Sequence, residues 1–99
     1  MIAGSQCRAA RALVEVTRGK LSLRSGVDEA VIHDFERKID KPDEQTIEAL
    51  QTALEELGAV FIAENGGGIG VRLKFTAVEA RQIARLEGEG GIVANDRVP

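Results

Sequence analysis

The stretch TRGKLSLRSGVDEAVIHDFER, residues 17–37, decides the fold because it predicts two short helices joined by a tight turn. Thr17 and Asp28 are good N-caps for the two helices, since Ser, Thr and Asp side chains accept hydrogen bonds from the free N–H groups of a helix start. We expect Leu21 to point inward from the first helix. Gly26 supplies the unhindered backbone that a sharp turn requires. The second helix would bury one face, formed by Val31, Ile32 and Phe35.

Two helices joined by a short turn that contains Gly form a helix-turn-helix unit, whose second helix enters the DNA major groove. The order and spacing of further residues extend this pattern: Leu21, Ser25, Gly26, Val27, Ile32, Phe35, Glu36, Arg37, Pro42, Thr46, Ile47, Leu50, Ala53 and Leu54. On these residues the chain, from about residue 7 to residue 58, resembles the Xre/Cro/CI family of prokaryotic and phage regulators. The resemblance implies a mainly α fold, a lambda-repressor-like helix-turn-helix domain of four to five helices.

The composition indicates one small domain with one core. The chain has 99 residues, 43% of them apolar, with three Phe and no Trp or Tyr. A core of Leu, Val, Ile and Ala suits packed helices, and this length suffices for one such core. Cys7 is the only cysteine, which excludes an internal disulfide and a zinc site built on cysteines, and fits a reducing compartment. No apolar run has the length of a membrane span, and the N-terminus has no signal-peptide core, so we expect a cytoplasmic, nucleoid-associated protein without a membrane partner.

The charge is distributed unevenly along the chain. The net charge is −3, yet residues 1–41 carry eight basic and six acidic residues. Residues 42–99 carry five basic and ten acidic residues. Most of the acidity therefore lies outside the segment that would contact DNA, where a local excess of positive charge matters more than the total.

A helix is expected to precede the two-helix unit. It would begin at a Ser5 cap and end near Val16, and its buried stripe at helical spacing would consist of Ala9, Ala12, Leu13 and Val16. In the family that the chain resembles, an arginine of this helix pairs with a glutamate near the end of the second helix of the unit. The resemblance therefore implies a structural ion pair between Arg11 and Glu36.

The sequence after the unit predicts further elements. Asp43 would cap a helix over 44–57 with an apolar stripe formed by Ile47, Leu50, Leu54 and Leu57. Residues 60–64 and 70–75 alternate like strands around a glycine-rich tip and predict a β-hairpin. A capping-box pattern starts an extra helix over 76–86. We thus expect the DNA-binding domain over 1–58, a hairpin and helix extension over 59–87 and an exposed tail over 88–99.

The extension is the candidate dimer surface, because an isolated two-stranded ribbon is marginally stable. The candidate interface residues are Val60, Ile62, Val71, Leu73, Phe75 and Ile83. Packing of these residues within their own chain is the alternative. A two-fold dimer would place its second helices about one DNA turn apart, roughly 34 Å, and would bind a pseudo-palindromic operator.

The resemblance also implies which residues contact DNA. Arg18, at the start of the first helix of the unit, would bind a phosphate, because its charge and the helix dipole both favour an anion. The residues implied for the groove floor are Glu29, Ala30 and Asp34, with His33 at the edge of the groove. Those implied for the flanking strand are Arg37, Lys38 and Lys41. The function implied is sequence-specific binding of duplex DNA by a transcriptional regulator that acts as a repressor and a homodimer.

The acidic residues of the second helix leave two interpretations open. Family members usually present Gln, Arg, Ser or Asn to the groove, whereas this chain presents Asp28, Glu29 and Asp34, which the phosphate field repels. A carboxylate can accept a hydrogen bond from cytosine N4, so these side chains could contact C. Alternatively, the DNA-contacting face is weakened or lost, and the protein is an interaction module, such as an antiactivator or an antitoxin, with a protein partner.

No set of residues indicates catalysis, a cofactor or a metal site. His33 is the only histidine, and the Ser and Thr residues lack an evident base. The glycine cluster over 66–70 returns into a strand rather than into a helix start, which is typical of a hairpin tip and not of a phosphate-binding loop. We therefore expect neither enzymatic activity nor a cofactor.

Overall fold

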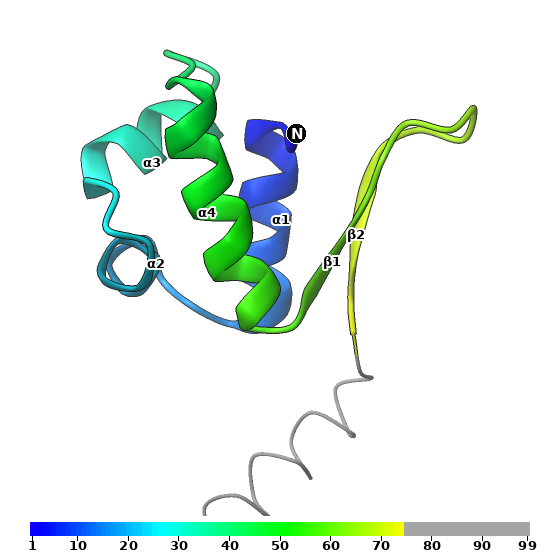
Figure 1. Cartoon of the computed structure of the whole chain (residues 1–99), viewed down its shortest axis with the longest axis horizontal. Coiled ribbons are helices and arrows are strands. Elements are labelled where there is room, and N and C mark those ends of the chain that lie inside the picture. Colours follow the sequence, from blue (N-terminus) through cyan, green and yellow to red (C-terminus); the bar gives the residue numbers. More distant parts are fainter. Residues whose placement is uncertain (75–99) are drawn as a thin grey trace, which may run out of the picture.

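The computed structural model describes residues 1–74, and these residues form four helices and one two-stranded antiparallel sheet (Figure 1). The helices are α1 (Gly4–Val14), α2 (Arg18–Ser25), α3 (Glu29–Glu36) and α4 (Glu44–Glu56). The strands are β1 (Ala59–Ile62) and β2 (Gly70–Leu73). The expected helix over 76–86, the tail over 88–99, Phe75 and Ile83 lie outside the described residues. None of the helices in residues 1–74 is both long enough and apolar enough to cross a membrane.

The two helices of the central unit form where the sequence predicts them. The Thr17 hydroxyl accepts a hydrogen bond of 3.0 Å from the Lys20 N–H, so Thr17 caps α2 as expected. Asp28 occupies the N-cap position of α3, but its side chain makes no capping hydrogen bond, so that part of the prediction is wrong. Instead, the Asp28 carbonyl accepts from the N–H groups of Val31 and Ile32, which starts the helix through the backbone alone.

The prediction for α1 is wrong in its bounds and in its buried face. Ala3, not Ser5, is the N-cap residue, and the helix ends at Val14. The expected stripe faces outward, because Ala9 and Ala12 are exposed and Leu13 is 39% exposed. The face that α1 buries consists of Gly4, Gln6, Cys7 and Ala10. Because this face includes a polar residue and a glycine, the spacing of apolar residues does not reveal it.

The four helices enclose one core: α4 contacts α1 and α2, and α3 packs against the same two helices (Figure 1). Asp43 caps α4 by accepting a hydrogen bond of 2.8 Å from the Thr46 N–H, as expected. Complete removal of an aliphatic side chain from water stabilises the fold by about 1.5–3 kcal/mol. Five aliphatic side chains of α2, α3 and α4 are fully buried: Leu21, Ile32, Ile47, Leu50 and Leu54.

The hairpin packs against α1, and its tip projects away from the helices (Figure 1). Its register pairs Phe61 with Val71 and Val60 with Arg72. Phe61 and Val71 pack against the core, so side-chain alternation directs Val60 and Ile62 to the opposite face. The hairpin itself is confirmed, with strands shorter than the expected 60–64 and 70–75.

Candidate nucleic-acid interface

The turn between α2 and α3 is held by a compact set of local hydrogen bonds. Gly26 ends α2 with a φ of 78°, which a residue with a side chain rarely adopts. The Ser22 hydroxyl donates a hydrogen bond of 2.6 Å to the Val27 carbonyl, and the Val27 N–H donates one of 3.2 Å to the Ser25 hydroxyl. Val27 itself is buried. These contacts set the angle between the two helices before any ligand binds.

The start of α2 lies close to the side chain of Glu29. Arg18 is the first residue of α2 and is half-buried. The Glu29 carboxylate lies against the same helical turn, because a Cβ atom added at Gly19 would be 3.7 Å from Glu29 Oε1. A helix start carries a partial positive charge that attracts anions. The side chain of Glu29 therefore competes for the place at which the resemblance would put a DNA phosphate.

The outward side of α3 is acidic and partly exposed. Glu29 and Ala30 are exposed at its start. One turn later, His33 Nδ1 and Asp34 Oδ1 are 3.0 Å apart, with side chains 42% and 43% exposed. The structure thus brings together the four residues implied for the groove floor and its edge. They offer carboxylate acceptors and one imidazole, and they offer no Arg or Lys donor.

The cations implied for the flanking strand lie after the end of α3. Arg37, Lys38 and Lys41 are exposed, and within residues 1–74 their side chains form no ion pair or hydrogen bond. Lys38 adopts a φ of 62°, the conformation for which glycine is the least strained residue. The α3 segment, about 12 Å long at 1.5 Å per residue, separates these cations from Arg18.

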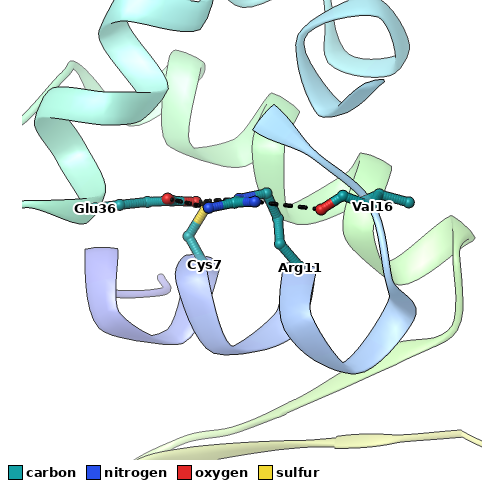
Figure 2. Close-up of polar contacts among 4 residues, drawn as sticks. All are labelled: Cys7, Arg11, Val16 and Glu36. Carbon is teal, nitrogen blue, oxygen red and sulfur yellow. Dashed lines mark hydrogen bonds and ion pairs between the residues drawn. The ribbon is translucent and has the colours of Figure 1, made fainter. Parts of the chain in front are cut away.

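A largely buried ion pair joins α1 to the end of α3 (Figure 2). Arg11 Nε and Nη2 donate hydrogen bonds of 2.7 Å each to the two carboxylate oxygens of Glu36, whose side chain is 2% exposed. Arg11 also donates to the Val16 carbonyl, at 3.2 Å. The pair that the resemblance implied is thus present, and it joins α1 to the end of α3 and to the loop before α2.

The ionisation of the groups around this pair follows from their contacts. The hydrogen bond to Glu36 raises the pKa of Arg11 above its ordinary value, although burial acts in the opposite direction. Cys7 is fully buried, and its Sγ donates to Glu36 Oε2 at 3.3 Å. Burial first, and then the nearby Glu36 charge, raise the pKa of the Cys7 thiol far above 9.0. Cys7 is therefore a neutral hydrogen-bond donor in the folded protein.

Gln6 and Gly4 hold the fold together, and the pattern of apolar residues in the sequence does not reveal either of them. Gln6 is 6% exposed and donates through Nε2 to the carbonyls of Ile62 and Gly70, at 3.3 and 2.9 Å. Its Oε1 accepts from the Ala3 N–H at 2.9 Å. Gly4 allows α1 to contact the end of α3, because a Cβ atom there would be 2.0 Å from the Phe35 carbonyl oxygen. Both depend on contacts between segments distant in sequence.

The candidate dimer residues fall on two different faces of the hairpin. Val71 packs against the core of its own chain, and Leu73 shares that face by alternation. Val60 is half-buried and Ile62 is 36% exposed on the outward face. Of the candidate dimer residues within 1–74, only Val60 and Ile62 therefore lie on the outward face of the hairpin, where they can contact another chain.

Within residues 1–74, no three His, Cys, Asp or Glu side chains come together as a possible metal site. No protein-family model matches the sequence, and no curated protein matches it either. Within residues 1–74 the surface consists of an acidic outward helix, three cations beyond its C-terminal end that form no ion pair, and one half-buried arginine at the start of α2.

Proposed function

We propose that the protein is a DNA-binding transcriptional regulator of the Xre/Cro/CI kind, with α2 and α3 as its helix-turn-helix unit. It binds duplex DNA with α3 in the major groove and represses transcription by occupying a promoter. The flanking cations neutralise phosphates and fix the position of the protein, and the residues on the outward side of α3 contact base edges.

One observation carries this proposal: α3 is held by one face and is free on the other. Ile32 and Phe35 are buried, and the Arg11 pair anchors Glu36 at the end of the helix. The opposite side carries Glu29 and Ala30 in contact with solvent. A rigid helix with an exposed polar face and cations beyond its end is the arrangement that major-groove binding needs.

The carboxylates of α3 then act as base contacts. Glu29 and Asp34 can accept hydrogen bonds from cytosine N4 while Arg18, Arg37 and Lys41 hold the backbone on either side. These cations offset the repulsion between the carboxylates and the phosphates. Because binding depends on their contacts with phosphates, the affinity for DNA falls steeply with salt. A homodimer binds a pseudo-palindrome with half-sites about one turn apart.

The same carboxylates support a second candidate function, an interaction module with a basic protein partner. The side chains of His33 and Asp34 are partly exposed, and Glu29 is exposed at the start of α3. In this case the acidic face of α3 repels DNA and attracts the partner. The two functions differ in what happens when the charges are removed.

The test is fluorescence anisotropy with labelled DNA, titrated at several salt concentrations against unrelated competitor. The DNA comprises the region upstream of the protein's own gene and a library of genomic fragments. We expect binding that survives competitor, saturates at two chains per site and is lost in Arg18→Ala with Arg37→Ala. Arg24→Ala is the matched control, because Arg24 is an exposed arginine of α2 outside the proposed contacts. Failure to bind any genomic fragment would contradict the proposal.

A charge-removal pair separates the two functions. If Glu29 and Asp34 contact bases, Glu29→Gln with Asp34→Asn strengthens binding to unrelated DNA and abolishes preference for the selected fragment. If these residues only repel DNA, the wild-type protein binds no fragment and the variant acquires unspecific binding. The second outcome would favour the interaction module.

A further inference from the structure

A groove of about 550 Å³ lies between the outward face of α1 and the C-terminal end of α3. Ser5, Arg8, Ala9 and Ala12 line it from α1, and Arg37 and Lys38 line it from the other side. Its α1 wall includes two of the alanines that the sequence predicted to be buried and that the structure exposes. Part of the apolar stripe of α1 that the structure exposes therefore lines this groove.

The walls of this groove carry three cations and no available anion. Arg8, Arg37 and Lys38 are exposed, and within residues 1–74 their side chains make no ion pair or hydrogen bond. Glu36 is the one carboxylate in the lining, and both of its oxygens already accept hydrogen bonds from Arg11. Three like charges around one hollow repel one another, and an anion placed between them would relieve that repulsion.

Lys38 lies directly after the end of α3 in a left-handed conformation. Its backbone adopts a φ of 62°, which is costlier for lysine than for glycine. Its side chain contributes no hydrogen bond or ion pair within the described part of the chain that would offset this cost. The Ile39 N–H donates to the Asp34 carbonyl and the Lys38 N–H to the Phe35 carbonyl, so this conformation closes the end of α3 and leaves the Lys38 side chain free to contact a ligand.

We propose that this groove binds backbone phosphates of the DNA strand that flanks the segment contacted by α3, with Arg8 as a contact outside the two-helix unit. This inference rests on the proposed function and extends its footprint onto α1. Ala9 and Ala12 contribute only small side chains to the α1 wall, which lets a sugar–phosphate backbone approach closely. The groove is continuous with Arg37 and Lys38, so one strand can follow all three cations.

DNA fits this groove better than an acidic peptide does. A DNA strand presents single phosphate charges that repeat along its backbone. The three cations suit this spacing of charge, because they are distributed over two walls and do not converge on one point. The groove is also shallow and has only alanine side chains as its apolar surface, so a peptide would find no pocket for a large apolar anchor.

The test uses the full chain and a fluorescent duplex of arbitrary sequence, about three helical turns long, because phosphate contacts do not depend on sequence. Binding is measured from low to moderate salt for wild type, Arg8→Gln and the control Arg24→Gln. We expect Arg8→Gln to weaken binding and to reduce the slope of log K against log salt by about one. Arg24→Gln should retain both the affinity and the slope.

A second variant distinguishes the loss of a phosphate contact from weaker binding caused by unfolding. Lys38→Gly relieves the backbone strain, so we expect a raised melting temperature together with a slope reduced by about one. Loss of binding in a protein that has become more stable cannot come from a damaged fold. A variant that gains stability and keeps its affinity would argue against a phosphate contact by Lys38 and would overturn the groove as proposed.

The remaining outcomes distinguish this inference from the proposed function. If wild type binds duplex DNA and Arg8→Gln behaves like Arg24→Gln, the groove proposal is wrong and the DNA-binding function stands. If wild type binds neither the arbitrary duplex nor any genomic fragment, both proposals are overturned. If wild type binds a labelled polyaspartate peptide in an Arg8-dependent manner and binds no duplex, the occupant is an acidic protein segment and not DNA.

Discussion

Arg11 and Glu36 form a bidentate ion pair, with both carboxylate oxygens of Glu36 at 2.7 Å from guanidinium nitrogens. The two residues are separated by 25 positions in the chain. They join the helix that precedes the two-helix unit to the end of the helix that we place in the major groove. The Cys7 thiol donates to the same carboxylate, so Glu36 has three donors around it.

We expect Arg11→Met to destabilise the protein by about 3–5 kcal/mol, because it leaves the buried Glu36 charge without its partner. The double variant Arg11→Met with Glu36→Leu should be much less destabilised than the sum of its single variants. Urea unfolding of the four proteins in this cycle measures the coupling. If Arg11→Met lowers the free energy of unfolding by only about 0.5 kcal/mol, as is typical of exposed ion pairs, the pair contributes little to stability.

The Cys7 thiol predicts a loss of stability at alkaline pH. Burial keeps the pKa of the folded thiol far above 9.0, while the unfolded chain releases this proton near the ordinary value. The neutral thiol of Cys7 therefore contributes fully to the free energy of unfolding below about pH 8.5. Above that pH this contribution declines, by up to about 1.4 kcal/mol per pH unit.

Urea unfolding at a series of pH values between the thiol and lysine pKa values measures this decline. The chain has no Tyr, so no tyrosine titration overlaps this range. Cys7→Ser keeps a donor for Glu36 and has no group that titrates there, so its stability should vary less with pH. Equal slopes for the two proteins would refute the assignment.

Gly4→Ala and Gly19→Ala should change stability in opposite directions. A Cβ atom on Gly4 would be 2.0 Å from the Phe35 carbonyl oxygen, so α1 must move away from α3, at a cost of about 1–3 kcal/mol. A Cβ atom on Gly19 would have no contact closer than 3.7 Å, and alanine favours the helix by up to about 1 kcal/mol. Thermal unfolding of both variants measures the difference. A neutral Gly4→Ala would mean that the two helices can separate at no cost.

Gln6→Leu should loosen the hairpin. The substitution removes the amide donor to the carbonyls of Ile62 and Gly70 and leaves them less satisfied, at a cost of about 1–3 kcal/mol. We expect amide hydrogens of β1 and β2 to exchange faster while those of α4 remain protected. Gln45→Leu, at an exposed position of α4, is the control. Unchanged exchange in the strands would show that Gln6 does not hold the hairpin.

The proposed homodimer makes a prediction for the outward face of the hairpin. Ile62 is 36% exposed there, and a charge in an apolar interface is strongly unfavourable. Ile62→Asp should therefore give monomers in sedimentation experiments, while Ile69→Asp, at the exposed hairpin tip, should not. Wild-type dimers that persist in Ile62→Asp would place the interface elsewhere.

Local chemistry allowed several elements to be predicted from sequence. The Thr17 and Asp43 caps and the Gly26 turn each depend on residues within a few positions of one another, and the hairpin pairs two strands that a short glycine-rich tip connects. Such features are determined by backbone preferences and short-range hydrogen bonds. The Arg11 and Glu36 pair came from the resemblance and not from any local pattern.

The face that α1 buries was decided by tertiary structure alone. The helix has one stripe with Ala9, Ala12 and Leu13 and another with Cys7 and Ala10, and apolar spacing favoured the first. The second is buried because Gln6 finds carbonyl acceptors on the hairpin, about 60 residues away in the chain, as its separations of 56 and 64 positions show. Sequence by itself determined that α2, the turn at Gly26, α4 and the hairpin form, since those are local choices. Only the assembled fold determined which side of α1 faces solvent, because the partners that satisfy a buried polar group come from distant segments.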